Sequence, residues 1–225
     1  MATAANALVI MTKAPMAGQV KTRLVPPLDY EQAAALAEAL LLDQIDNLAK
    51  FTDASLYINY TPAFAYFEKF TAHGFSLFEQ QGDDLGLRMR HAFERLFALG
   101  HRRIILIGSD LPAFPHATLT RVFDSLSRGM EVVLCPTDDG GYCLVAMQCP
   151  VFDIFEGITW SRNDVLARSI QRLATLGARY ELLKTSYDID TWDDVRRLHS
   201  ACENGQLAMS NTVALLRRLS AKGLL

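Results

Sequence analysis

Asp110 is the first residue whose position in the sequence points to chemistry. It follows an unbroken aliphatic run at residues 104–107 and a Gly-Ser pair, and Pro112 comes two residues later. Such a run is typical of a strand buried on both faces of a parallel sheet, and proline prevents the strand from continuing. We therefore expect Asp110 at the carboxyl end of a central strand, where open α/β sheets bind ligands and a carboxylate can hold a divalent metal. The alternative is a carboxylate that only caps a turn.

A basic loop follows the first predicted strand. Residues 12–27 contain three prolines and Gly18, and they carry Lys13, Lys21 and Arg23 without any acid. Cationic side chains without neighbouring carboxylates can bind the phosphates of a nucleotide. A solvated basic loop is the alternative. The Gly-x-Gly-x-x-Gly motif is absent, and so is the P-loop, because two residues separate Gly18 from Lys21.

Further acids stand in predicted turns. Asp188 and Asp190 follow a predicted strand at residues 180–184, and Asp138 and Asp139 precede a pair of glycines. Aspartate is common in turns because it hydrogen-bonds to nearby backbone, and this is the alternative for each of them. Strand ends on one side of a parallel sheet converge on a single crevice. We therefore expect the basic loop, the acid after the central strand and the Asp188/Asp190 pair to face one pocket.

The segment at residues 80–86 combines glycine and aspartate just before a predicted helix. Asp83 and Asp84 would stabilise the start of that helix through its dipole. Gly82 and Gly86 would let a ligand approach the backbone closely. Both interpretations stay open at this point.

The elements that must position these residues alternate along the chain. Short apolar or alternating runs predict strands at residues 7–11, 54–60, 75–78, 104–107, 131–136, 142–147 and 180–184. Helical periodicity and end signals predict helices at residues 29–50, 62–72, 87–99, 115–128, 161–176, from 191 onward, and 209–222.

Helix caps and strand order complete the prediction of the fold. Capping boxes are expected at Asp29 and Thr191, and Ser161 is expected to cap the helix that begins there. Alternating strands and helices predict a three-layer α/β/α domain with a mostly parallel sheet. The tight acidic turn at Asp139 predicts that one strand returns antiparallel.

Length and composition suit one globular domain spanning residues 1–225. The chain is 50% hydrophobic and 21% charged, with a net charge of -3. This charge offers no general attraction to nucleic acid or to an anionic membrane. No apolar stretch is long enough to span a bilayer, and the first ten residues do not resemble a signal peptide. The four cysteines form no Cys-x-x-Cys pair, so we expect free thiols and a cytoplasmic protein.

An ordered set of short motifs resembles the GT-A-type nucleotide-diphospho-sugar transferase superfamily. The closer resemblance is to the bacterial DUF2064 group, usually described as glycosyltransferase-like or nucleotidyltransferase-like. The motifs cover nearly the whole chain and are Thr12-Lys13-Ala14-Pro15, Gly18, Lys21-Thr22-Arg23-Leu24, Gly82-Asp83-Asp84-Leu85-Gly86, Arg88-Met89, Gly108-Ser109-Asp110-Leu111-Pro112, Asp139-Gly140-Gly141-Tyr142 and Asp188-Ile189-Asp190-Thr191. The chain is also similar to the guanylyltransferase of coenzyme F420 biosynthesis in its Lys-Ser/Thr-Arg-Leu element and its aspartate after a central strand.

Two features of the superfamily are missing from this sequence. The Leu-Ala-Gly-Gly-x-x-x-Arg-Met-Gly loop of the sugar-nucleotide pyrophosphorylases is absent. The Asp-x-Asp motif is also incomplete, because Ser109 and Asp110 supply a single carboxylate at that point. Substrate and reaction therefore stay open among the activities of the superfamily.

The resemblance implies a Rossmann-like GT-A domain and a role for each motif. The N-terminal half would bind a nucleotide, with cations on the donor phosphates and the turn at Gly82 near the base or ribose. The implied nucleotide-binding residues are Thr12, Lys13, Gly18, Lys21, Arg23, Gly82 and Asp84. The implied acceptor-binding residues are Asp139, Gly140, Gly141 and Tyr142. Asp110 and Asp190 would be ligands of Mg²⁺ or Mn²⁺, and Lys21, Arg23 and Asp110 would be the catalytic residues.

The expected function is that of a metal-dependent transferase with a nucleoside phosphate donor. A nucleoside triphosphate would transfer its nucleotidyl group to a small phosphorylated acceptor, or a nucleotide sugar would transfer its glycosyl group. A nucleotide-binding protein without catalysis is the alternative from a different class. The chain would act as a monomer, or as a homodimer through the apolar face of residues 213–219.

Overall fold

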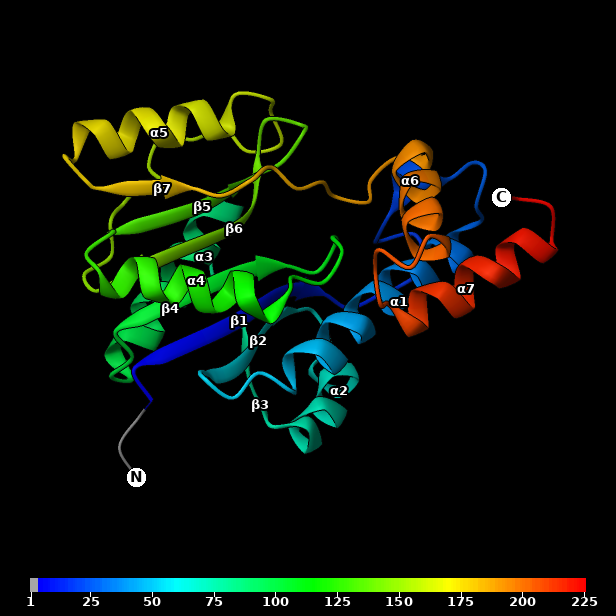
Figure 1. Cartoon of the computed structure of the whole chain (residues 1–225), viewed down its shortest axis with the longest axis horizontal. Coiled ribbons are helices and arrows are strands. Elements are labelled where there is room, and N and C mark those ends of the chain that lie inside the picture. Colours follow the sequence, from blue (N-terminus) through cyan, green and yellow to red (C-terminus); the bar gives the residue numbers. More distant parts are fainter. Residues whose placement is uncertain (1–3) are drawn as a thin grey trace.

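The computed structural model describes residues 4–225, which form one α/β unit (Figure 1). The first three residues of the predicted domain at 1–225 lie outside the described residues. No helix in the described part of the chain is long and apolar enough to cross a membrane.

A seven-stranded sheet in the order β3-β2-β1-β4-β6-β5-β7 forms the middle layer. Its strands are β1 (Asn6–Lys13), β2 (Ser55–Thr61), β3 (Phe75–Glu79), β4 (Arg103–Gly108), β5 (Val132–Pro136), β6 (Tyr142–Gln148) and β7 (Tyr180–Leu182). Only β6 runs antiparallel, against both β4 and β5, and the other described pairs are parallel. The predicted α/β class, the mostly parallel sheet and the single antiparallel strand are confirmed.

Helices cover both faces of this sheet. The helices are α1 (Tyr30–Leu48), α2 (Phe64–Phe67), α3 (Leu85–Ala98), α4 (His116–Ser127), α5 (Val165–Thr175), α6 (Trp192–Glu203) and α7 (Ser210–Ala221), and the 3-10 turns are η1 (Thr22–Leu24) and η2 (Glu68–His73). Apolar side chains of α1, α2 and α4 pack on one face, and those of α3 and α5 pack on the other. The predicted three layers are therefore present.

A third apolar cluster joins the two ends of the chain. Helices α6 and α7 lie beside α1 in Figure 1, and Leu24 and Leu36 pack there with Ile189, Leu198 and Leu216. The apolar face at residues 213–219, which was one alternative for a dimer interface, contributes Leu216 and Leu219 to this core. The cluster fixes the basic loop and the loop after β7 to the same group of helices.

The ends of two helices follow their sequence signals. Asp29 accepts a hydrogen bond from the Gln32 backbone amide, and the Gln32 side chain accepts one from the Asp29 amide. Thr191 and Asp194 form the equivalent capping box at the start of α6. Each box satisfies amide groups that a helix leaves unpaired at its first turn.

Two local predictions are wrong. The helix expected at residues 62–72 is a single α-helical turn, α2, followed by the 3-10 turn η2. Ser161 does not cap α5, because its φ is 62° and the helix begins only at Val165. A serine before an acidic turn carries the same sequence signal whether or not the backbone bends away first.

Candidate functional site

A cavity of about 490 Å³ opens where β1 and β4 end. Its wall takes side chains from the ends of these strands, the basic loop, the first turns of α3 and the loop after β7. The amino end of β6 also reaches it, because an antiparallel strand begins at the edge where its parallel neighbours end. Ligands of open α/β proteins bind at this edge of the sheet.

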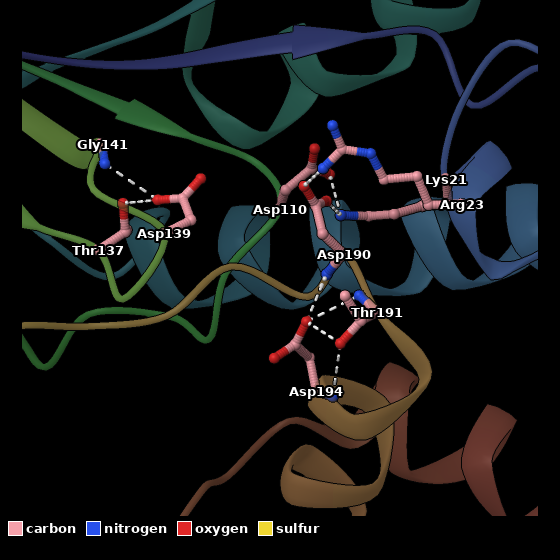
Figure 2. Close-up of polar contacts among 9 residues, drawn as sticks. All are labelled: Lys21, Arg23, Asp110, Thr137, Asp139, Gly141, Asp190, Thr191 and Asp194. Atoms are coloured by element: carbon pink, nitrogen blue, oxygen red, sulfur yellow. Dashed lines mark hydrogen bonds and ion pairs between the residues drawn. The ribbon is translucent and has the colours of Figure 1, made fainter. Parts of the chain in front are cut away.

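Lys21 lies at the centre of the charged part of this cavity, between two acids (Figure 2). Its Nζ is 3.1 Å from Asp110 Oδ1 and 3.2 Å from Asp190 Oδ1. The Lys21 side chain is only 2% exposed, whereas those of Asp110 and Asp190 are 52% and 40% exposed. Arg23 reaches Asp190 from the solvent side at 3.5 Å. The sequence-predicted cations and acids thus lie together, although they come from distant parts of the chain.

Local backbone structure points Lys21 into the cavity. Its φ of 49° and ψ of 33° are left-handed, and η1 begins at the next residue. The buried Leu24 then anchors this turn in the third apolar cluster. Left-handed backbone is uncommon for a residue with a Cβ and is maintained only where the surrounding structure holds it.

Two hydrogen-bond systems position the acids. The Ile189 amide donates to the Asp110 carbonyl at 2.8 Å, which ties the loop after β4 to the loop after β7. The Asp194 carboxylate accepts from the amides of Asp190 and Thr191 at 3.2 and 2.7 Å. The first turn of α6 therefore holds Asp190 in place.

Asp188 is an additional acid of the cavity wall. Burial and the negative charges of Asp190, Asp139 and Asp110 raise the pKa of Asp188 to about 7, although Lys21 opposes the shift. Asp188 therefore interacts electrostatically with Asp110, Asp139 and Asp190 as well as with Lys21. Sequence analysis placed Asp188 in the right turn but chose only its neighbour two residues later as a ligand.

Thr12 and Lys13 line the same cavity, together with two residues that sequence analysis did not assign, Gln80 and Arg88. The Gln80 side-chain amide donates to the carbonyls of Thr12 and Asn59 at 3.2 and 2.9 Å. These bonds join the ends of β1, β2 and β3. The sequence signal for Gln80 was that it precedes the glycine-aspartate turn, and Arg88 belonged to the motif Arg88-Met89 without a role assigned to it.

Gly82 and Asp84 are not among the residues that line the cavity. Asp84 caps α3 by accepting from the Leu87 amide at 2.8 Å. Gly82 has a φ of 128°, and a Cβ there would lie 2.7 Å from the Leu87 Cβ. Its carbonyl accepts from Arg88 Nε at 2.9 Å. The contacts of this turn build the start of α3 and orient Arg88, and a direct contact with base or ribose stays a prediction.

The hairpin between β5 and β6 contributes one predicted acceptor residue, Tyr142, to the cavity wall. Asp139, Gly140 and Gly141 do not line it. Asp139 accepts from the Thr137 hydroxyl at 2.6 Å and from the Gly141 amide at 3.0 Å, so it organises the turn (Figure 2). Their contact with an acceptor stays a prediction. Gly18 and Arg23 are likewise absent from the lining.

Asp110 and Asp190 are the carboxylates that could share a metal. No cluster of three or more His, Cys, Asp and Glu side chains placed to hold a metal occurs among residues 4–225. Mg²⁺ is commonly held by one or two carboxylates, with substrate phosphates and water as the other ligands. Two partly exposed carboxylates that line one cavity fit that kind of ligation.

Comparison with known proteins places this chain in a family. The family described as "Uncharacterized protein conserved in bacteria (DUF2064)" matches residues 44–162, more than half of the chain. The chain belongs to this family. The matched segment contains Asp110 but neither Lys21 nor Asp190, which lie on either side of it.

Relatives of known structure or activity extend the comparison over most of the chain. A candidate nucleotide-diphospho-sugar transferase from Desulfovibrio desulfuricans G20 is 30% identical, with a TM-score of 0.86 over 97% of this chain and 96% of that one. A 2-phospho-L-lactate guanylyltransferase from Methanothermobacter thermautotrophicus is 26% identical over 78% of this chain and 76% of its own length. A cytidylyltransferase from Leptospira borgpetersenii, 13% identical with a TM-score of 0.62 over 97% of this chain and 95% of its own, shares the fold. The chain thus has the fold found in nucleotidyltransferases and nucleotide-diphospho-sugar transferases.

Proposed function

We propose that this DUF2064 protein is a transferase that moves the nucleotidyl group of a nucleoside triphosphate to a small phosphorylated acceptor, with Mg²⁺ or Mn²⁺. One observation supports this proposal above the others. A buried lysine ammonium and two carboxylates meet in one cavity at the ligand-binding edge of the sheet. Cations for phosphates and carboxylates for a metal are the groups that phosphoryl-type transfer requires.

The proposed reaction needs positioning more than covalent help from the protein. A phosphate oxygen of the acceptor attacks the α-phosphorus of the triphosphate, and the bond from the α-phosphorus to the bridging oxygen breaks to release pyrophosphate. Lys13 and Lys21 would neutralise charge on the phosphates, while Asp110 and Asp190 would hold the metal. The bound metal would add positive charge against the leaving pyrophosphate. Gln80 and Arg88 also line the cavity and would orient the nucleoside.

The guanylyltransferase relative supports nucleotidyl transfer over other chemistry. Its name gives a nucleotide donor and a phosphorylated acceptor, and its similarity extends over 186 residues. Glycosyl transfer from a nucleotide sugar is the second candidate, and the description of the 30% identical structure favours it. The two reactions share the donor phosphates and the metal, so their products distinguish them.

The experiment compares the products of two donor classes. The protein is incubated with Mg²⁺ and each of ATP, GTP, CTP and UTP, with 2-phospho-L-lactate and related phosphorylated hydroxy acids as acceptors. Parallel reactions contain nucleotide sugars. Release of pyrophosphate that a chelator and Asp110→Asn both abolish supports nucleotidyl transfer. Release of nucleoside diphosphate from a nucleotide sugar supports the second candidate. Nucleotide binding that needs no metal, with no turnover of any donor, would contradict both and indicate a binding protein.

A further inference from the structure

The Lys21 ammonium contacts both of the carboxylates that would hold a divalent cation. It contacts one oxygen of Asp110 and one of Asp190, at 3.1 and 3.2 Å. Arg23 takes the other oxygen of Asp190 at 3.5 Å. A metal that used Asp110 and Asp190 together would compete with the ammonium for the same carboxylate oxygens, since ion pairs and metal bonds both require close contact.

Burial makes this competition costly for a metal that arrives alone. The Lys21 side chain is 2% exposed, and its ion-pair partners in the described residues are these two acids. If a metal took both acids, the ammonium would remain buried without a partner and beside a dication. An unpaired buried charge and a close like charge are each strongly unfavourable.

A nucleotide removes that cost. Lys21 lines the cavity together with Lys13, so phosphates that enter there come within reach of its flexible stem. The ammonium then exchanges two carboxylates for phosphate oxygens, and the carboxylates become free for the metal. The ammonium, the carboxylates and the metal would therefore each keep a partner of opposite charge during the exchange.

We propose that Lys21 is the resident counter-ion of the empty site, so that metal and nucleotide bind as a pair and the metal binds only weakly alone. This inference rests on the proposed function, because it assumes a nucleotide and a metal in this cavity. It assigns Lys21 a second task beside contact with the donor phosphates. By linkage, nucleotide must raise the affinity for metal by the same factor as metal raises the affinity for nucleotide.

The test measures Mn²⁺ binding to the nucleotide-free protein by calorimetry. Lys21→Met removes the ammonium and keeps an unbranched side chain, and Lys13→Met removes an equal charge from the same cavity wall. Lys13 makes no ion pair among residues 4–225, so it is the matched control. We expect Lys21→Met to bind Mn²⁺ at least about tenfold more tightly than the wild type, since a close like charge is gone. Lys13→Met should change the affinity by less than about threefold, because an exposed charge that makes no ion pair in the described residues is screened. The gain should vanish in Lys21→Met/Asp110→Asn.

Two outcomes would overturn the inference. One is tight Mn²⁺ binding to the nucleotide-free wild type, equal to that of Lys21→Met. The other is an equal gain in Lys13→Met, which would indicate a general field effect. Circular dichroism and thermal melting establish that the variants are folded.

A second measurement uses the wild type alone and does not depend on any variant. Mn²⁺ is titrated with and without a non-hydrolysable nucleoside triphosphate, after correction for metal bound to free nucleotide. Tighter metal binding in the presence of nucleotide supports the exchange, and unchanged affinity contradicts it. If no nucleotide binds under any condition, the proposed function is wrong. If nucleotide binds but Lys21→Met shows no gain in Mn²⁺ affinity, only the counter-ion role of Lys21 is wrong.

Discussion

At the scale of single residues, the site depends on charge that is balanced within a few ångströms. Lys21 pairs with Asp110 and Asp190, while Asp188 stands behind them with a raised pKa of about 7. Lys21 also has a left-handed backbone, which side chains with a Cβ adopt rarely. The left-handed backbone and the two ion pairs together fix the direction of this side chain, and backbone of this kind is common at functional sites.

Asp110→Asn should remove metal-dependent nucleotide binding and leave the fold intact. Asparagine keeps the size of the side chain but loses the charge that attracts a divalent ion, and Asp110 is half exposed, so burial energetics change little. Thermal shift with a nucleoside triphosphate, with and without Mg²⁺, measures the effect. Unchanged Mg²⁺ dependence in the variant would remove Asp110 from the metal site.

Sequence reasoning found Lys21, Asp110 and Asp190 because each follows a predicted strand and strand ends converge. The nucleotide-binding role expected of Gly82 and Asp84 stays a prediction, since a turn glycine and a helix-capping aspartate have the same sequence pattern as ligand-binding residues. Here the side chain of Asp84 caps α3 and Gly82 bonds Arg88 through its carbonyl. A hydrogen bond to a backbone carbonyl, such as that from Arg88 to Gly82, cannot be predicted from the residue types of one sequence.

At the scale of elements, α6 is the support of the second acid. The Asp194 carboxylate accepts from two backbone amides and from the Thr191 hydroxyl, at 3.2, 2.7 and 2.7 Å. The capping box was predictable from residues 191–194. The backbone hydrogen bond from Ile189 to Asp110, by contrast, joins segments far apart in the sequence, so no local sequence pattern predicts it.

Asp194→Ala should destabilise the protein by roughly 1–2 kcal/mol, the scale for losing a helix cap. It should also weaken nucleotide binding with metal, because Asp190 loses the partner of its amide. Asp193→Ala is the matched control, since Asp193 carries the same charge in the same turn and its side chain is 89% exposed. Denaturant unfolding and calorimetric titration measure the two effects. Equal results for the two variants would contradict a positioning role for Asp194.

Strand β7 is held to α4 by a carboxylate, and this predicts a pH dependence. Glu181 accepts from Ser125 Oγ at 2.7 Å and from Arg121 Nη2 at 2.6 Å. The Ser125 hydroxyl and the Arg121 guanidinium hold the pKa of Glu181 below its ordinary value, although partial burial opposes the shift. A lowered folded-state pKa contributes stability above the unfolded-state pKa, and this contribution is lost as pH falls through the folded-state pKa.

Glu181→Gln should therefore unfold more easily than the wild type at neutral pH. The difference should shrink as pH falls below the ordinary glutamate pKa of about 4.3. Urea unfolding across that pH range measures it. A difference that stays constant with pH would show that the charge of Glu181 does not contribute.

At the scale of the whole molecule, ligand binding should appear as stability. A ligand that binds only the folded state at 100 times its dissociation constant adds about 2.7 kcal/mol to the free energy of unfolding. For a domain of this size, each kcal/mol corresponds to roughly 2–4 °C in the melting temperature. We expect this rise when nucleoside triphosphate and Mg²⁺ are present together, and a smaller rise with either alone. A full rise from Mg²⁺ by itself would contradict paired binding.

The third apolar cluster packs α7, the last helix of the chain, together with the loop that follows β1. Leu24 is next to Arg23, and Ile189 is next to Asp190. Both pack in this cluster with Leu216 and Leu219 of α7. Asp110, by contrast, follows the end of β4. Lys21 and Asp190 thus lie in segments that the third apolar cluster holds, whereas Asp110 follows a strand of the sheet. Deleting residues after 209, or substituting larger side chains there, should loosen the packing that holds the loops of Lys21 and Asp190. None of these residues lines the cavity itself.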